Sequence, residues 1–176
     1  MTYCEEIRSK NTRLKQAIST KDILDWFKSI KNKRIYKFIS FDIESFYPSI
    51  TKELLEEALE WAAMHTNISE QEKKVILQAS QSFLYSKGTP WVKKGGTNFD
   101  ISKGAYHGAQ ACELVGLYLH TKLEKLPSFQ SIMYRDDCLG ITTPRQTEKL
   151  RQSIIKLFSD HHLGITIEVG LTRVNF

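Results

Sequence analysis

The sequence has few cysteines, and none is placed for a disulfide framework or a zinc site. Only three occur among the 176 residues, at positions 4, 112 and 138, and no C-x-x-C motif is present. Small secreted proteins are rich in cysteines, and structural zinc sites space their cysteines closely. We therefore expect reduced cysteines in an intracellular protein without a zinc site.

Long hydrophobic runs are also missing. The longest candidate, ELVGLYLH at 113–120, is much shorter than the roughly 18 apolar residues that indicate a membrane span. The N-terminus is polar and charged, which is not the pattern of a signal peptide. We therefore expect no membrane segment and no secretion signal.

The chain does contain enough apolar residues for one domain, together with a modest excess of positive charge. Apolar residues make up 41% of the sequence, and the formal net charge is +5. A chain of this length can bury a substantial core. The positive charge permits a polyanionic partner such as nucleic acid, but it does not by itself identify one.

The spacing of apolar residues predicts several helices. They are expected after residue 20 and over the ranges 51–65, 69–84, 108–126 and 146–162. Thr51 is a candidate N-cap, and Ser69 with Glu72 has the pattern of a capping box. The side chains expected to face inward on the helix over 69–84 are Val75, Ile76, Ala79 and Phe83.

Strands are expected over 36–42, on both sides of a polar turn within 131–142, and over 164–170. Asp42 ends the first of these strands, and Asp136 and Asp137 lie at the polar turn. Carboxylates gathered on adjacent strand ends repel one another unless a divalent cation lies between them. Oxygen ligands with open positions suit magnesium. The sequence therefore predicts a magnesium site at these three residues.

Three segments resemble motifs A, B and C of a reverse-transcriptase palm, in that order. They are FDIESFYPSI at 41–50, GAYHGAQACELVG at 104–116 and YRDD at 134–137. The resemblance implies an α+β fold, namely a right-hand polymerase palm with part of the fingers, built on a small, mainly antiparallel sheet backed by helices.

The same resemblance implies how the chain is divided. Residues 1–34 are expected to form an N-terminal helical or fingers segment, and residues 35–176 the palm. A fingers-type insertion is expected over about 66–103, and the chain is expected to end before a thumb domain.

The resemblance also implies roles for the motif A and motif C residues. Asp42, Asp136 and Asp137 would be catalytic and would bind two Mg²⁺ ions, which Mn²⁺ can replace, together with the backbone carbonyl of Ile43. Tyr47, five residues after Asp42, would pack under the sugar of the incoming nucleotide. A bulky side chain there leaves no room for a 2′-hydroxyl and so favours deoxynucleotides.

Further binding residues are expected around these motifs. Gly108 and Gln110 take the place of the Pro-Gln-Gly turn that many reverse transcriptases have in motif B, and would approach the nucleotide. Phe46, beside Tyr47, is a candidate nucleotide contact and also a candidate core residue. The candidate nucleic-acid contacts are Arg34, Lys37, Lys87, Trp91, Lys93, Lys94 and Tyr134.

The function that follows is template-directed DNA synthesis on a primer, with dNTPs as substrates and RNA as the expected template. Three alternatives stay open. Motif A also resembles that of family B DNA polymerases, although their Asp-Thr-Asp motif C is missing here. The other two are a non-catalytic, polymerase-derived nucleic-acid-binding domain and a nuclease that uses carboxylate-bound metal.

Overall fold

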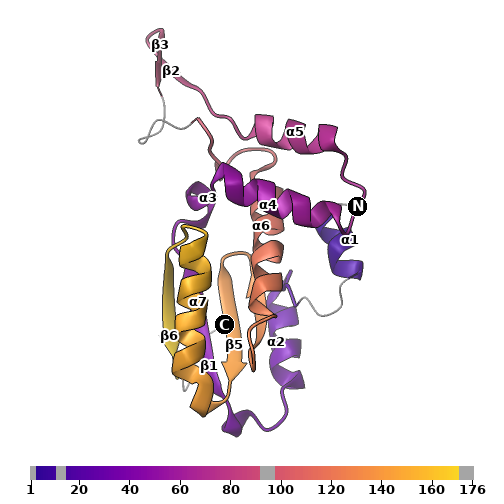
Figure 1. Cartoon of the computed structure of the whole chain (residues 1–176), viewed down its shortest axis with the longest axis vertical. Coiled ribbons are helices and arrows are strands. Elements are labelled where there is room, and N and C mark those ends of the chain that lie inside the picture. Colours follow the sequence, from indigo (N-terminus) through magenta and orange to yellow (C-terminus); the bar gives the residue numbers. More distant parts are fainter. Residues whose placement is uncertain (1–2, 11–14, 92–97, 171–176) are drawn as a thin grey trace.

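A four-stranded antiparallel sheet forms the lower half of the structure in Figure 1, a computed structural model that describes residues 3–10, 15–91 and 98–170. Its strands are β1 (Lys37–Ile43), β4 (Gln130–Tyr134), β5 (Asp137–Thr142) and β6 (Ile165–Val169). They lie in the order β4-β5-β1-β6, so β1 is a central strand that pairs with both β5 and β6. The four strands expected from the sequence are confirmed.

Alternation along β1 explains how the sheet presents its two faces. Ile39, Phe41 and Ile43 are buried on one face, whereas Asp42 between the last two is exposed on the other. Successive side chains of a strand point to opposite faces. The antiparallel register places Asp42 directly opposite Asp137 on β5, so these two side chains share a face.

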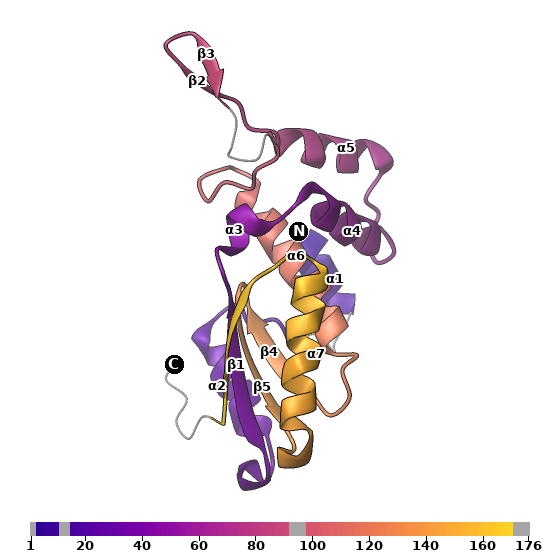
Figure 2. The ribbon, with the colours of Figure 1, turned by 60° about the vertical axis from the view of Figure 1, so that its left-hand side comes forward.

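Helices cover both faces of the sheet, as Figure 2 shows. On the buried face of β1 lie α6 (Gly108–Leu123) and α7 (Thr147–Asp160), where the rings of Phe41 and Phe158 are 5.1 Å apart. On the other face lies α2 (Thr20–Ser29), whose Trp26 belongs to a smaller cluster with Leu139. Asp42 and Asp137 are exposed at the end of the sheet where β1 ends and β5 begins.

The remaining elements lie beyond that end of the sheet. They are α1 (Tyr3–Lys10), α3 (Phe46–Ser49), α4 (Lys52–Ala63), α5 (Glu70–Ala79), and the strands β2 (Leu84–Ser86) and β3 (Thr89–Trp91). Short 3₁₀ turns occupy Lys33–Ile35 and Pro144–Gln146. The β2–β3 hairpin projects away from the rest of the molecule in both ribbon views (Figures 1 and 2).

The helix starts expected from the sequence are confirmed. The hydroxyl of Thr51 accepts a hydrogen bond from the backbone N–H of Leu54 at 3.2 Å. Ser69 and Glu72 form the reciprocal capping box, with the Ser69 backbone N–H donating to the Glu72 carboxylate at 2.8 Å. Each cap satisfies a backbone donor that the first turn of a helix leaves unpaired.

The expected extent of α5 is wrong. The helix ends at Ala79, and Val75 and Phe83 are 56% and 57% exposed rather than inward-facing. The chain leaves the helix because Ser82 donates a backbone hydrogen bond to Asn98 at 2.7 Å. Ala79 is exposed as well, whereas Ile76 packs against the core. Pairing with a distant segment therefore overrides the local helical pattern.

The expected end of α6 is also too late, since the helix stops at Leu123 rather than Leu126.

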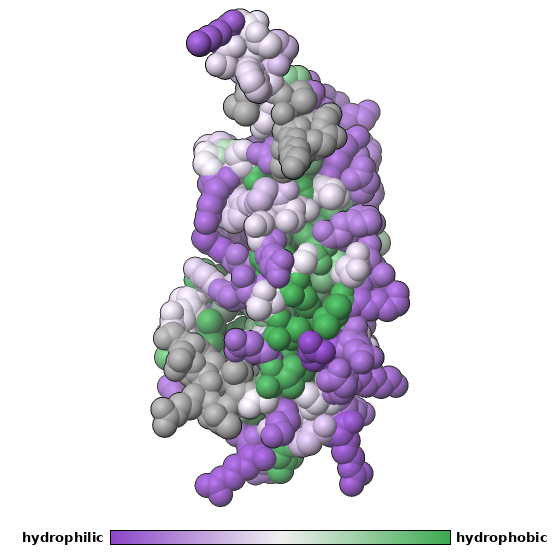
Figure 3. Space-filling model, turned by 90° about the vertical axis from the view of Figure 1, so that its left-hand side faces the viewer, coloured by the Kyte–Doolittle hydropathy of each residue, from purple (hydrophilic) through white to green (hydrophobic). Residues whose placement is uncertain are grey.

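Of the helices that the structure describes, none has both the length and the apolar character that a membrane crossing requires. Figure 3 shows a band of hydrophobic residues bordered by hydrophilic ones on the side of the molecule where β6 lies. Val169 of β6 is 37% exposed, as is common for a residue on an outer strand.

Candidate active site

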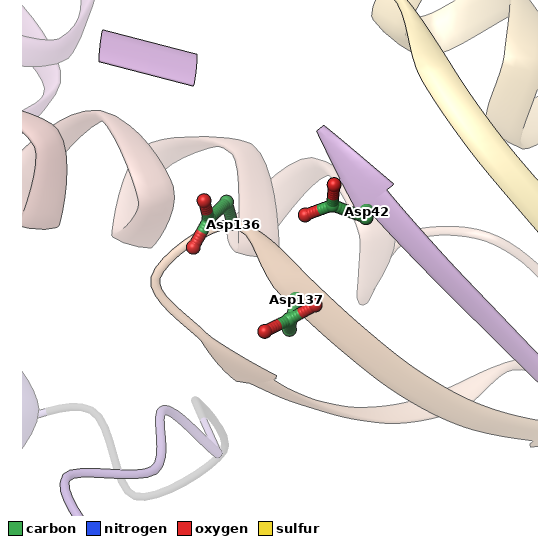
Figure 4. Close-up of side chains that lie close together, drawn as sticks. All are labelled: Asp42, Asp136 and Asp137. Atoms are coloured by element: carbon green, nitrogen blue, oxygen red, sulfur yellow. The ribbon is translucent and has the colours of Figure 1, made fainter. Parts of the chain in front are cut away.

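Three carboxylates meet at the end of the sheet, as the sequence predicted. Asp42 ends the exposed side of β1, Asp137 begins β5, and Asp136 lies in the turn between β4 and β5 (Figure 4). One ligand oxygen from each of them lies within 4.8 Å of the others. Asp42 and Asp137 are exposed and Asp136 is partly buried, so the cluster opens to solvent.

The backbone around the cluster fixes these positions. Arg135, at the turn that carries Asp136, has a φ of 56°, and Ser45, just after β1, has a φ of 49°. Residues other than glycine rarely adopt such angles, and they do so where the surroundings hold them. The backbone N–H of Ile43 donates to the carbonyl of Asp136 at 3.3 Å, which joins the two loops directly.

Partial burial, followed by repulsion between the carboxylates, determines the electrostatics of Asp42 and Asp137. Partial burial raises the pKa of Asp42, and the negative charges of Asp136 and Glu44 raise it further. Partial burial also raises the pKa of Asp137, with added contributions from Asp42 and Asp136. Each group therefore loses its proton less readily than an isolated aspartate, as expected when like charges face one another.

The donor set fits a hard divalent cation. Mg²⁺ takes oxygen ligands, is often held by one or two carboxylates, and keeps water or substrate phosphates in its remaining positions. Three carboxylates that repel one another and open to solvent meet those requirements at Asp42, Asp136 and Asp137. The carbonyl of Ile43, which follows Asp42 at the end of β1, stays a predicted ligand.

Tyr47 lies near this cluster, on the short helix α3. Burial raises the pKa of its phenol, and the charges of Cys112 and Asp136 add to the effect, whereas Arg135 opposes it. Its ring is half-buried. Its neighbour Phe46 is only 2% exposed and packs in the main core, so the ring of Phe46 does not face the solvent side of the site.

Lys103 is a basic residue near the site that the sequence reasoning missed. Its Nζ lies 6.0 Å from the centroid of the Tyr47 ring, and the side chain is exposed. The sequence feature that could have identified it is its position in SKGAYHG at 102–108, five residues before α6 begins. A lysine at this position can offer a positive charge to an anionic ligand that lies against Tyr47.

The two motif B candidates occupy the first turn of α6. Gly108 is buried, and a β-carbon there would lie 2.4 Å from the backbone oxygen of Ser102. The glycine is thus required by the close approach of the preceding loop. Gln110 is exposed.

The candidate nucleic-acid contacts are spread over the molecule. Arg34 and Lys37 are exposed at the opposite end of β1 from Asp42. Lys37 begins β1 and lies roughly 17 Å from Asp42 for a rise of about 3.4 Å per residue. Lys87 and Trp91 are exposed on the projecting hairpin, which lies beyond the end of the sheet that carries Asp42.

Tyr134 is the remaining candidate within the described residues, and it lies next to the carboxylates. Tyr134 ends β4 beside the turn, half-buried, with the guanidinium of Arg135 5.6 Å from its ring centroid. Lys93 and Lys94 lie outside the described residues. These contacts all stay predictions.

The arrangement of sheet and helices is shared with telomerase. The telomerase of Candida tropicalis truncated from its C-terminal domain matches with a TM-score of 0.68 and 14% identity, covering 98% of this chain and 40% of that one. The chain has a reverse-transcriptase-like fold. The expected α+β class, with a small antiparallel sheet backed by helices, is confirmed.

Two further telomerase structures share this reverse-transcriptase-like fold. The C. tropicalis enzyme in complex with a TWJ fragment of telomeric RNA has a TM-score of 0.71 at 14% identity, with coverage of 96% and 32%. The corresponding Candida albicans complex has a TM-score of 0.60 at 12% identity, with coverage of 99% and 34%. This chain thus spans 32% to 40% of these telomerase chains. No protein-family model and no curated protein matches the sequence.

Proposed function

We propose that this chain is the catalytic palm of an RNA-directed DNA polymerase, which transfers deoxynucleotidyl groups from dNTPs to the 3′-hydroxyl of a primer. The observation that carries the proposal is the meeting of Asp42, Asp136 and Asp137 within 4.8 Å at one open end of the sheet. The shared fold with telomerase supports a polymerase rather than an unrelated metal-binding protein.

Asp42, Asp136 and Asp137 would hold the divalent ions, with Mg²⁺ as the expected metal and Mn²⁺ as a substitute. Bound there, such ions would neutralise charge on the phosphates and activate the primer hydroxyl. The carboxylates themselves set where the primer end and the triphosphate meet, because they are fixed by β1 and by the β4–β5 turn. Positioning and charge neutralisation supply most of the rate in phosphoryl transfer.

Tyr47 and the neighbouring Lys103 would select and orient the nucleotide. The half-buried ring of Tyr47 would lie against the sugar and exclude a 2′-hydroxyl. The exposed ammonium of Lys103, 6.0 Å from that ring, would neutralise part of the triphosphate charge. A lysine acts in this way as a compact, mobile point charge.

Primer extension tests the proposal. The wild-type chain is incubated with labelled primer, dNTPs and Mg²⁺ or Mn²⁺ on matched RNA and DNA templates, alongside Asp136→Asn. Asp160→Asn, at the exposed end of α7, is the matched control because it changes the same functional group away from the site. We expect extension by the wild type and the control, and a loss of at least a hundredfold in the Asp136 variant.

The same assay separates the alternatives. Extension on DNA but not on RNA would favour the family B alternative. Degradation of the labelled strand without added nucleotides would indicate a nuclease. Binding of primer–template without either reaction would indicate a non-catalytic nucleic-acid-binding domain and would contradict the proposal.

A further inference from the structure

The turn that carries Asp136 rests directly on the middle of α6. Gly116 on that helix is buried, and a β-carbon at this position would lie only 3.2 Å from the carbonyl oxygen of Arg135. That is closer than an ordinary van der Waals contact between carbon and oxygen. The Arg135 carbonyl belongs to the peptide unit that continues into Asp136, so any displacement of this oxygen moves the Asp136 backbone.

A glycine at this position is costly for the helix. Glycine inside a helix is less favourable than alanine by about 1 kcal/mol. Gly116 lies in the interior of the sixteen-residue α6, so no turn or cap requires it. The close approach of the Arg135 carbonyl supplies a reason for the missing side chain.

The N-terminal segment holds the same turn from another side. Ala17 donates a backbone hydrogen bond to Met133 at 2.8 Å, and Met133 donates one to Lys15 at 3.0 Å. Residues 15–17 therefore pair with β4 just before it enters the turn. This pairing fixes the strand that leads to Tyr134 and Arg135.

The side chain of Gln16 lies between α6 and the N-terminal helix. Its side-chain Nε2 would lie 3.7 Å from a β-carbon at position 116, and its Oε1 accepts a hydrogen bond from Arg8 at 2.9 Å. Arg8 also forms an ion pair with Glu113, one turn earlier on α6, and both side chains are largely shielded from solvent. The N-terminal helix and the segment 15–17 thus contact α6 next to Gly116.

We infer that Gly116 and Gln16 are positioning residues for Asp136 and Asp137, through a seat formed by α6 and the segment 15–17 under the β4–β5 turn. Neither residue belongs to the carboxylate cluster. Gly116 faces the backbone of the turn, whereas Gln16 lies beside Gly116 and pairs through its backbone with Met133 of β4. The functional meaning of this seat rests on the proposed polymerase activity, but its structural effect can be measured without it.

The test compares the 176-residue wild-type chain with Gly116→Ala and Gln16→Ala by backbone amide NMR without metal. Thr121→Ala is the control, because it also introduces alanine into α6 but at a position more than a turn from Gly116. We expect the amide resonances of residues 135–137 to shift in both test variants and to stay unchanged in the control.

Metal binding gives a second measurement. Changing a residue that orients metal ligands typically weakens metal binding by 10- to 100-fold. We expect the Mn²⁺ dissociation constant to rise by about tenfold in Gly116→Ala and to stay unchanged in Thr121→Ala. If Gly116→Ala does not fold, the Gln16→Ala variant decides the question by the same two measurements.

Unchanged resonances at 135–137, or equal shifts in Thr121→Ala, would overturn the inference. A wild-type chain that neither extends primers nor binds Mn²⁺, while the resonances still shift in the two test variants, would refute the proposed function but leave the positioning role standing. The two failures are therefore distinguishable.

Discussion

The charge of the carboxylate cluster leads to a prediction about stability that needs no nucleic acid. We consider Asp137→Asn, which keeps the shape of the side chain but removes its charge. In the folded chain, the Asp137 carboxylate faces both Asp42 and Asp136, and its pKa is raised by partial burial and by these two neighbours. Without a cation, removing this charge should therefore stabilise the fold.

The size of the effect follows from the distances. For ligand oxygens up to 4.8 Å apart, one pair of unit charges repels by about 0.9 kcal/mol in water. Screening at physiological salt, with a Debye length of about 8 Å, reduces this value to about 0.5 kcal/mol. Two pairs give about 1 kcal/mol, which corresponds to a rise of about 2–4 °C in melting temperature for a chain of this size.

Divalent metal should make the wild type more stable than Asp137→Asn. A metal that binds only the folded wild type at ten times its dissociation constant contributes about 1.4 kcal/mol, or about 3–6 °C. Melting is followed by circular dichroism or calorimetry, in chelator and then with increasing Mg²⁺ or Mn²⁺. We expect Asp137→Asn to be more stable in chelator, and the wild type to gain more on adding metal.

Asp160→Asn serves as the control for this measurement. Asp160 pairs with Lys156 at 3.0 Å on the surface of α7. Removing the charge of Asp160 should therefore lower the stability of the fold slightly and leave the response to metal unchanged. The reasoning would be refuted if Asp137→Asn melted at or below the wild-type temperature in chelator. Equal responses to metal in the wild type and Asp137→Asn would refute the metal site itself.

Three further predictions concern pH, sugar selection and phosphate binding. Because the pKa values of Asp42 and Asp137 are raised above the ordinary 3.8, the folded chain holds protons more tightly than the unfolded one. In melting experiments, Asp137→Asn should therefore be more stable than the wild type at pH values above the raised pKa values. This difference in stability should vanish as the pH falls to about 3.8. Tyr47→Ala should admit ribonucleotides in primer extension, whereas Tyr47→Phe should still reject them. If neither variant changes the selection of deoxynucleotides, Tyr47 does not exclude the 2′-hydroxyl. Lys103→Gln should raise the KM for dNTPs about tenfold with little change in kcat, and Lys103→Arg should restore it; an unaltered KM in Lys103→Gln would exclude the phosphate contact.

The local features of the fold could be predicted because their causes are local. The alternation of Ile39, Phe41 and Ile43 predicts a strand with one buried face, and the structure has that strand. The N-cap at Thr51 and the capping box at Ser69 depend on residues three positions apart, and both are present. In each case the determining residues are neighbours in the sequence.

The errors arose where distant segments compete with a local pattern. The helical spacing continues past Ala79, but the backbone of Ser82 pairs with Asn98, so α5 ends early and Phe83 is exposed. Lys103 was missed because only folding brings its ammonium next to Tyr47.

The residue types of the candidate site could be predicted from the sequence, because carboxylates at the end of one strand and at the turn of a hairpin have a recognisable pattern. Their geometry depends on the folded chain. Antiparallel register places Asp42 opposite Asp137, and the hydrogen bond from Ile43 brings Asp136 to the same end of the sheet. The seat formed by Gly116 and Gln16 is also tertiary, because it depends on a backbone oxygen that no residue type reveals.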